Sequence, residues 1–221
     1  MTPHLDNLKI SIENCLVKSR VLLALLPILI LGCSQKVNLY AYQTFHSKNI
    51  VNCIIEIPAG TNKKIEYNSK LGAFVVDQRN GIDRQIDFLP YPSNYGFIPS
   101  SHSDPATGGD GDALDIIVIS ESLKTGTIIP SIPIGVFKLI DDGEEDYKIL
   151  CIPFQKDKRI ISAKNFLELQ EKYPKIIEIL EQWFLNYDTR DPLVSKGWGD
   201  EKEALRIIGQ SEKSLETKNS H

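Results

Sequence analysis

The stretch "GGDGDALDIIVIS", Gly108 to Ser120, sets three aspartates and three glycines directly before a run of branched apolar residues. The apolar run predicts a buried strand, and the glycines allow the backbone ahead of it to turn tightly. With such a turn, Asp110, Asp112 and Asp115 can converge on one point, where their charges repel unless a cation binds. Oxygen ligands without His or Cys favour Mg²⁺, Mn²⁺ or Ca²⁺ over Zn²⁺. We therefore expect a divalent-cation site at the mouth of this strand.

Two other interpretations of the acidic stretch are weaker. An EF-hand loop would need glycine at its sixth position, where Asp115 stands, and a helix where strand-like residues follow. A solvated acidic turn is ordinarily the better interpretation of an Asp/Gly-rich loop. It is weakened here because a second cluster, "DDGEEDYK" at Asp141–Lys148, closes another predicted hairpin, and Glu56 lies in a third predicted strand.

Short strands are predicted along most of the chain around this stretch. Alternating or apolar runs bounded by turn residues predict strands within 49–60, 63–67, 72–78, 115–120, 127–141 and 147–154. "RNGIDR" at 79–84 supplies a turn, and "DDGEED" at 141–146 supplies another. The Pro- and aromatic-rich segment 85–100 is expected to be irregular or an edge strand. Strands at this spacing indicate a small barrel.

Helices are predicted only late in the chain. Ser162 is expected to cap a helical pattern over 163–187, with Pro174 marking a kink or a break. A last helix is expected to start near Asp200, with Glu203 completing a capping pair, and to fray into the tail 212–221. The predicted fold class is α+β, mainly β, with helices packed outside the barrel.

The N-terminus has the order of a secretory signal. Lys18 and Arg20 precede the apolar run Val21–Leu31, and "GCS" follows. The run is too short to span a bilayer comfortably, since a spanning helix needs about 20 apolar residues. Cys33 after Gly32 resembles the acylated cysteine of a bacterial lipobox, so we expect 1–32 to be a cleaved lipoprotein signal. An uncleaved anchor or a start site placed too early are the alternatives.

The remaining chain reads as one acidic globular domain. The whole chain of 221 residues is 42% hydrophobic and 24% charged, and its formal net charge is −4. This acidic net charge does not favour binding of nucleic acid, although a small anion could bind in a local basic pocket. Cys53 and Cys151, in apolar runs, are expected to be buried thiols. No Ser/His/Asp set, P-loop or dinucleotide fingerprint occurs.

Candidate phosphate-binding side chains accompany the acidic clusters. Lys64 beside Glu66 offers a point charge, Arg84 a bidentate donor, and the tyrosines hydroxyl donors. Taken singly, Lys64 reads as a solvated lysine, Arg84 as a turn residue and the tyrosines as half-buried aromatics. Their occurrence together with two acidic clusters favours a site for a polyanion. The tyrosines concerned are Tyr91, Tyr95 and Tyr187.

The order of these motifs resembles the soluble family I inorganic pyrophosphatases. The matching pieces, over about 49–198, are "EIPAG", "KIEY", "DR" at 83–84, "YPSNYGFIP", "GDGDALD", "DDGEEDYK" and "WFLNY". The resemblance implies an OB-like five-stranded closed β-barrel with flanking C-terminal helices. It also implies Mg²⁺-dependent hydrolysis of pyrophosphate, with Mn²⁺ as a substitute, and a small symmetric homo-oligomer. The chain would divide into a signal (1–32), a linker (33–48) and a pyrophosphatase domain (49–221).

The resemblance also implies a role for each matching residue. Asp112 would be the general base toward the attacking water. Lys64, Arg84, Tyr91 and Tyr187 would hold the phosphates, with Arg79 the alternative to Arg84. Within the substrate site, Glu66, Tyr95, Asp142 and Lys148 would orient their neighbours. The metal set would be Asp110, Asp115, Asp141 and Asp146, with Glu56 near the cluster through water.

Two positions depart from the family pattern. Ala113 stands where the family usually has Pro or Glu, at a position expected to pack and not to ligate. Asp188 follows Tyr187 where the family has a phosphate-binding lysine, so we expect it to repel phosphate. A lost charge-assisted contact costs about 1.5 to 3 kcal/mol, which predicts weakened substrate affinity unless Arg190 or Lys196 replaces it.

Two functions follow from these observations. The first is an exported pyrophosphate hydrolase tethered to the membrane by lipid on Cys33, facing the periplasm or cell exterior; a cytoplasmic location is the alternative. The second is a catalytically weak or inactive protein of the same fold that binds metal and phosphate, motivated by Asp188. Asp112 and Lys64 favour the enzyme, because a binding site has no need of a general base.

Overall fold

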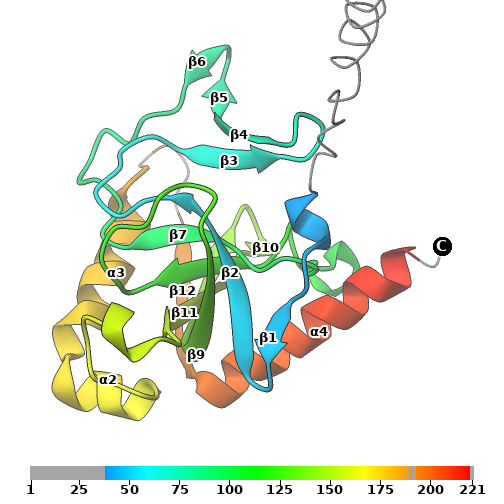
Figure 1. Ribbon diagram of the computed structural model, residues 1–221. Helices are drawn as coiled ribbons and strands as arrows, with labels where there is room; N and C mark the ends of the chain where they lie inside the picture. The colour runs from blue at the N-terminus through cyan, green and yellow to red at the C-terminus, as the bar shows by residue number, and fades with distance from the viewer. Residues whose placement is uncertain (1–37, 189, 191–192, 220–221) are drawn as a thin grey trace, which may run out of the picture. The chain divides into compact units, whose positions relative to one another are not determined.

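The computed structural model describes residues 38–188, 190 and 193–219, and sheet predominates in it (Figure 1). The described residues form one eight-stranded sheet and two separate two-stranded hairpins. The sheet strands are β1 (Phe45–Ser47), β2 (Ile50–Ile57), β7 (Asn94–Phe97), β8 (Asp115–Val118), β9 (Ile128–Asp141), β10 (Glu144–Glu145), β11 (Lys148–Pro153) and β12 (Val194–Asp200). The hairpin strands are β3 (Ile65–Asn68), β4 (Ala73–Val76), β5 (Gln78–Arg79) and β6 (Ile82–Asp83).

The strand pairings form a circuit of five strands. β2 pairs with β7, β7 with β8, β8 with β11, β11 with β9, and β9 returns to β2. Only the β8–β11 pairing in this circuit is parallel. β1 extends the sheet beside β2, and β10 and β12 both pair with β9. The expected mixed fold, mostly sheet, is confirmed.

The circuit has apolar side chains on both of its faces. Because neighbouring residues on a strand point to opposite faces, β11 sends Leu150 and Ile152 into one core cluster and Ile149 and Cys151 into another. A strand buried on both faces reads as a continuous apolar run, which is what made β2, β8 and β11 predictable. Cys53 and Cys151 are buried free thiols, as expected.

Three helices cover the two clusters. α2 (Phe166–Lys172) and α3 (Pro174–Asn186) pack on the first, and α4 (Glu201–Asn219) packs on the second through Ala204 and Ile208. The chain breaks between α2 and α3 at Pro174, as its missing N–H and ring require. Short 3₁₀ turns are η1 (Leu39–Ala41), η2 (Pro105–Thr107) and η3 (Lys156–Lys158).

The helix ends differ in part from the prediction. Asn165, not Ser162, caps α2, and its side chain accepts the Glu168 N–H at 2.8 Å. Asp200 caps α4 as expected, accepting the N–H groups of Lys202 and Glu203. The predicted fraying of 212–221 is wrong as far as Asn219, where α4 ends.

Several strands escaped the sequence analysis, β7 and β12 among them. The segment expected to be irregular contains β7, which lies between β2 and β8 in the middle of the sheet. Its prolines stand on either side of the four-residue strand, so they interrupt no pairing within it. β12 was not predicted, because "VSKGWGD" lacks the β-branched alternation of a strand.

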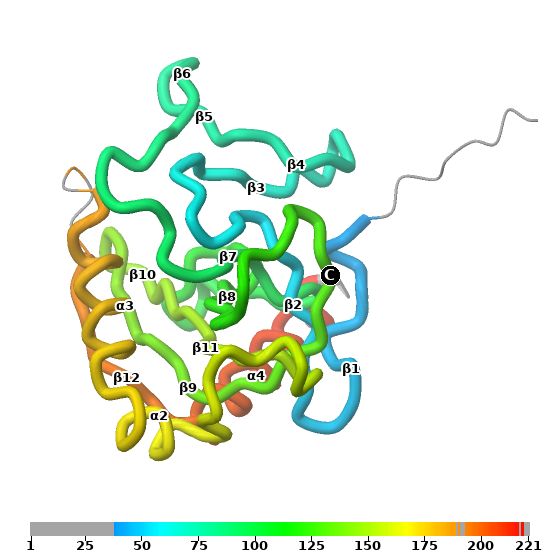
Figure 2. Tube along the Cα trace, turned by 60° about the vertical axis from the view of Figure 1, so that its left-hand side comes forward, coloured from blue at the N-terminus to red at the C-terminus, as the bar shows by residue number. Residues whose placement is uncertain are grey.

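The hairpins β3–β4 and β5–β6 lie over one end of the circuit, opposite α2, in both views (Figures 1 and 2). The turn between β5 and β6 uses Asn80 and Gly81, both at positive φ (57° and 77°), as a two-residue hairpin turn requires. The predicted turn at 79–84 is confirmed.

The expected signal (1–32) and Cys33 lie outside the described residues. From Asn38 onward, the segment interpreted as a linker carries η1 and β1, and the compact unit begins at Val37. Within the described part of the chain, no helix has the length and apolar character needed to cross a bilayer.

Candidate active site

A cavity of about 460 Å³ is lined both by residues of the circuit and by residues of β3. Nine carboxylates line it against two lysines, an excess of seven negative charges, and no His or Cys takes part. The carboxylates are Glu56, Glu66, Asp110, Asp112, Asp115, Asp141, Asp142, Glu144 and Asp146, and the lysines are Lys64 and Lys148. Tyrosines from four segments complete the wall: Tyr40, Tyr67, Tyr91, Tyr95 and Tyr187.

The parallel pairing of β8 with β11 brings the two acidic segments together. Asp115 begins β8 and Lys148 begins β11, and the two residues are direct register partners. A further bridge joins Gly109 to Glu145, where the Glu145 N–H donates to the Gly108 carbonyl at 2.7 Å. The loop before β8 and the hairpin before β11 therefore face the same space.

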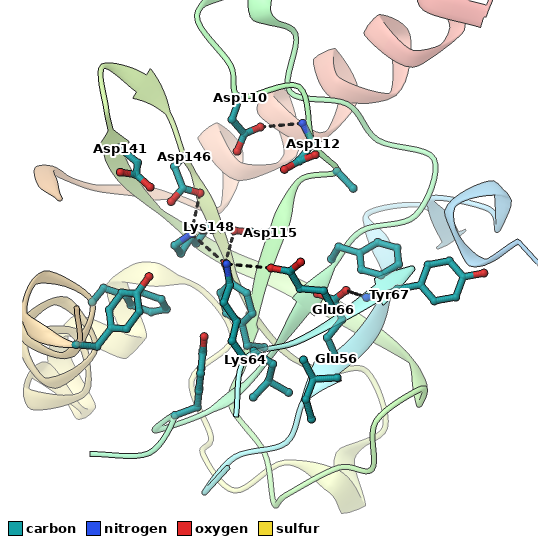
Figure 3. A pocket seen from close by; sticks show the side chains of 18 of the residues that line it. Glu56, Lys64, Glu66, Tyr67, Asp110, Asp112, Asp115, Asp141, Asp146 and Lys148 are labelled. Carbon is teal, nitrogen blue, oxygen red and sulfur yellow. Dashed lines mark hydrogen bonds and ion pairs between the residues drawn. The ribbon is translucent and has the colours of Figure 1, made fainter. Parts of the chain in front are cut away.

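Lys148 holds the centre of the carboxylate group. Its Nζ lies 2.8 Å from both Asp115 Oδ2 and Asp146 Oδ1, and 3.0 Å from the Tyr95 hydroxyl, which also donates to Asp115 (Figure 3). Only 3% of Lys148 is exposed. Burial opposes its charge, but Asp115 and Asp146 raise the pKa of Lys148. The ammonium stays protonated and partly neutralises the cluster.

The pKa values of the two carboxylates beside Lys148 are shifted in opposite directions. Burial raises the pKa of Asp115 to about 6 despite the ammonium. Although burial opposes it, the same ammonium lowers the pKa of Asp146. Asp115 is thus the member of this pair that more readily takes a proton.

The loop before β8 holds Asp110 and Asp112 by its own backbone. The Asp112 N–H donates to Asp110 Oδ1 at 2.9 Å, and Gly111 between them has φ of 87°. Burial raises the pKa of Asp110. Ala113 packs against an apolar cluster, as expected for a position that does not ligate.

Glu56 is a nearly buried carboxylate at the floor of the cavity. It is 7% exposed and accepts the Tyr67 N–H at 2.7 Å (Figure 3). Burial raises the pKa of Glu56 to about 8, although the Tyr67 N–H opposes the shift. In the absence of a metal ion, Glu56 is therefore largely protonated at neutral pH.

The opposite wall carries the cationic and hydroxyl groups. Lys64 Nζ lies 2.9 Å from Glu66 Oε1, and although burial opposes it, Glu66 raises the pKa of Lys64. Tyr187 stacks on Trp183 with ring planes 5° apart, and Tyr91 packs against the other side of this aromatic group. Burial raises the pKa of Tyr91 and of Tyr187, so both hydroxyls remain donors.

Neither candidate arginine lines the cavity. Arg84 Nη1 lies 2.9 Å from Asp77 Oδ2, and its Nη2 lies 3.8 Å from Asp188 Oδ2. Arg79 Nη1 lies 3.6 Å from the same Asp188 oxygen. Arg84 nevertheless lies close enough to Tyr187 to influence the pKa values of both groups. The choice between Arg84 and Arg79 stays a prediction.

The expectation for Asp188 needs correction. Its side chain is only 6% exposed and does not line the cavity, so it presents no open carboxylate to a phosphate. Arg190 binds it with Nε–Oδ1 and Nη2–Oδ2 distances of 2.8 and 2.9 Å. Hydrogen bonds from Arg190 lower the pKa of Asp188, which therefore stays charged. Arg190, one of the two residues considered as a replacement for the missing lysine, thus pairs with Asp188 itself.

The cavity suits hard divalent cations by its donor chemistry. All of its anionic donors are carboxylates, and their excess charge calls for cations. As they stand, no three His, Cys, Asp or Glu side chains of the described residues converge closely enough to form a metal cage. Lys148 occupies the space between Asp115 and Asp146.

Every predicted metal and phosphate residue except Arg84 lines this one cavity. The sequence analysis missed Tyr40, Tyr67, Glu144 and Phe184, which line it as well. Tyr40 lies in η1, and its ring packs 4.7 Å from Phe97 and 5.3 Å from Tyr67, centroid to centroid. The one signal for it was the apolar patch "LYAY" at 39–42 inside an otherwise polar segment.

Comparison with known protein families relates this chain to one of them. The family model described as inorganic pyrophosphatase matches residues 53–216. The chain belongs to the inorganic pyrophosphatase family. The resemblance to soluble family I members seen in the sequence is thereby confirmed.

Members of the inorganic pyrophosphatase family from several bacteria align with most of the chain. The Neisseria meningitidis serogroup A protein is 36% identical over 163 residues, covering 73% of this chain and 86% of its own. The Haemophilus influenzae protein is 38% identical over 166 residues, covering 73% and 87%. The crystal structure of the Neisseria gonorrhoeae inorganic pyrophosphatase superimposes with a TM-score of 0.61 at 32% identity, covering 76% and 92%. Tyr40, which lines the cavity, precedes the matched residues 53–216.

Proposed function

We propose that this protein hydrolyses inorganic pyrophosphate to two phosphates, using Mg²⁺ or, in its place, Mn²⁺. One observation carries the proposal: a single cavity joins nine carboxylates to Lys64, Lys148 and the hydroxyls of several tyrosines. A carboxylate-rich wall suits cations, and the cationic and hydroxyl wall suits phosphate. The relatives named inorganic pyrophosphatase, at 36% and 38% identity, support the same reaction.

The acidic wall would hold the cations. When bound, Mg²⁺ neutralises phosphate charge and lowers the pKa of a coordinated water. Asp112, an exposed residue that lines the cavity, would take the proton from the attacking water. The ligands would be Asp110, Asp115, Asp141 and Asp146, with Glu56 acting through water.

The opposite wall would bind the phosphates. Lys64 and Arg84 supply positive charge, and Tyr91 and Tyr187 supply hydroxyl donors whose pKa is raised by burial. The remaining predicted residues would act on their neighbours: Glu66 on Lys64, Tyr95 and Lys148 on Asp115, and Asp142 at the turn after β9.

Release of phosphate from pyrophosphate tests the proposal. We expect activity with Mg²⁺, none in excess chelator, and a loss in Asp112→Asn of about 10²- to 10⁴-fold in kcat, the usual contribution of a general base. Asp157→Asn, at an exposed aspartate in η3 remote from the cavity, is the matched control and keeps full activity. Equal inertness with and without Mg²⁺ would instead favour the silent binding protein.

Three finer features belong to this proposal. The five-strand circuit corresponds to the OB-like closed barrel implied by the resemblance, which the pairing of β9 with β2 supports. Export with lipid on Cys33 is supported by the order of basic flank, apolar run and small residue. A small symmetric homo-oligomer is supported by the resemblance to soluble family I proteins.

A further inference from the structure

Asp188 joins two parts of the molecule that lie about a hundred residues apart in sequence. It directly follows Tyr187 at the end of α3, while Arg79 and Arg84 belong to the β5–β6 hairpin and the residue after it. Its Oδ2 lies 3.6 Å from Arg79 Nη1 and 3.8 Å from Arg84 Nη2. The carboxylate is thus a bridge between the hairpin and α3.

The surroundings make this carboxylate a structural requirement for the arginines. Arg79, Arg84 and Arg190 bring three positive charges around one 6% exposed side chain. Removing the carboxylate of Asp188 would leave less negative charge among these three guanidinium groups, whereas Arg84 would keep its ion pair with Asp77.

The same geometry sets Arg84 beside the phosphate wall. Arg84 is held from two sides, by Asp77 at 2.9 Å and by Asp188 at 3.8 Å, and its side chain is 17% exposed. It also lies close to Tyr187 and Lys64, two of the phosphate-binding candidates. A fixed guanidinium loses less conformational freedom when an anion binds than a freely moving one.

We propose that Asp188 is a positioning residue: by bridging Arg84 and Arg79 to the end of α3, it holds Arg84 ready for a phosphate group of the substrate. This inference rests on the proposed pyrophosphate hydrolysis. If Asp188 positions Arg84, its carboxylate strengthens substrate binding. If Asp188 repelled the phosphate directly, its carboxylate would weaken substrate binding.

Steady-state kinetics of Asp188→Asn test the sign of that effect. We expect KM for Mg²⁺-pyrophosphate to rise about tenfold, the value of one charge-assisted contact, with kcat within twofold of wild type. Asp188→Glu, which keeps the charge, restores most of the affinity. Glu178→Gln, which breaks an exposed pair with Lys175 on α3, is the matched control and leaves KM unchanged.

A double-mutant cycle with Arg84→Gln separates positioning from a general loss of stability. If Asp188 acts through Arg84, Asp188→Asn raises KM much less in the Arg84→Gln background than in wild type. Equal effects in the two backgrounds, or a fall in KM for Asp188→Asn or Asp188→Lys, overturn the inference. Melting temperatures of all variants are measured alongside, because a purely structural role would lower them without the coupling to Arg84.

Binding of methylenediphosphonate, a non-hydrolysable analogue, separates the two proposals. Wild type that is inert toward pyrophosphate overturns the hydrolysis, yet weaker analogue binding by Asp188→Asn still supports the positioning role. Active wild type with unchanged analogue binding in Asp188→Asn overturns the positioning role alone. Calorimetry in the presence of Mg²⁺ gives both affinities.

Discussion

At the scale of single residues, Glu56 and Lys148 are the two acidic or basic residues of the cavity that are nearly buried. Lys148 has two carboxylate partners at 2.8 Å and therefore keeps its charge. Glu56 accepts a hydrogen bond from the backbone N–H of Tyr67, and burial raises the pKa of Glu56 to about 8. Near neutral pH the metal-free site can thus reduce its excess of negative charge by keeping a proton on Glu56.

This raised pKa predicts a pH-dependent stability of the metal-free protein. Between pH 4.5, the ordinary value for glutamate, and about pH 8, folded Glu56 keeps a proton that the unfolded chain releases. The free energy of unfolding therefore falls as pH rises through this window, by on the order of 3 kcal/mol from this residue. Urea unfolding in chelator at pH 5 and pH 8 measures the change.

Glu56→Gln is the control for this prediction. Glutamine can still accept the Tyr67 N–H but does not titrate, so the variant should lose less stability between the two pH values than wild type. If wild type and Glu56→Gln lost the same free energy of unfolding between pH 5 and pH 8, the pKa of Glu56 would not be raised.

At the scale of elements, η1 is an unexpected part of the active-site wall. The Leu39 N–H donates to the Tyr67 hydroxyl at 3.2 Å, and the Ser100 N–H donates to the Tyr40 carbonyl at 2.8 Å. Tyr67 in turn supplies the N–H that holds Glu56. The docking of η1 is therefore connected to the position of an acidic side chain in the cavity.

Truncation of Tyr40 should weaken both the fold and the site. Tyr40→Ala removes ring contacts with Tyr67 and Phe97, and we expect it to lower the free energy of unfolding by about 1 to 2 kcal/mol. We also expect kcat/KM for pyrophosphate to fall severalfold. Tyr42→Ala, at a more exposed tyrosine two residues later, should leave both quantities near wild type, as chemical denaturation and phosphate release can establish.

Sequence patterns predicted elements where one physical rule dominates. β2, β8 and β11 are buried apolar runs, and Pro174 divides the helical pattern as its ring requires. β12 could not be predicted, because its pairing with β9 is a tertiary contact that overrides the low strand propensity of its glycines. Asn165 replaced Ser162 as helix cap because both residue types cap well and only the path of the chain selects one.

The site was predictable to the extent that its residues are close in sequence. Asp110, Asp112 and Asp115 share one loop, so their convergence could be expected from spacing alone. The partners of Asp188 could not, since Arg79 and Arg84 reach it only through the packing of the β5–β6 hairpin toward α3. Tyr40 was missed because the segment around it is polar and was interpreted as a linker.

At the scale of the whole molecule, the proposed lipid anchor on Cys33 would stand only five positions before Asn38, the first described residue. The compact unit begins at Val37, and η1 starts two residues later. Cleavage before Cys33 would therefore leave every described element intact. The tether between the lipid and the wall of the cavity at Tyr40 would be only a few residues long.

Mass spectrometry of the protein expressed with its full N-terminus in a bacterial host tests this anchor. We expect a mature chain that begins at Cys33 and carries lipid, recovered with membranes. Cys33→Ser should block lipidation and release the protein from membranes without loss of specific activity. A wild-type product that keeps Met1 would contradict the prediction.

The parallel neighbours Asp115 and Lys148 stand 33 positions apart, with the whole of β9 between them. A growing polypeptide on the ribosome cannot complete the proposed cation site before β11 has emerged and paired with β8. We therefore expect affinity for magnesium to report completed topology, and chain fragments that end ahead of β11 to bind the ion no better than an unfolded peptide.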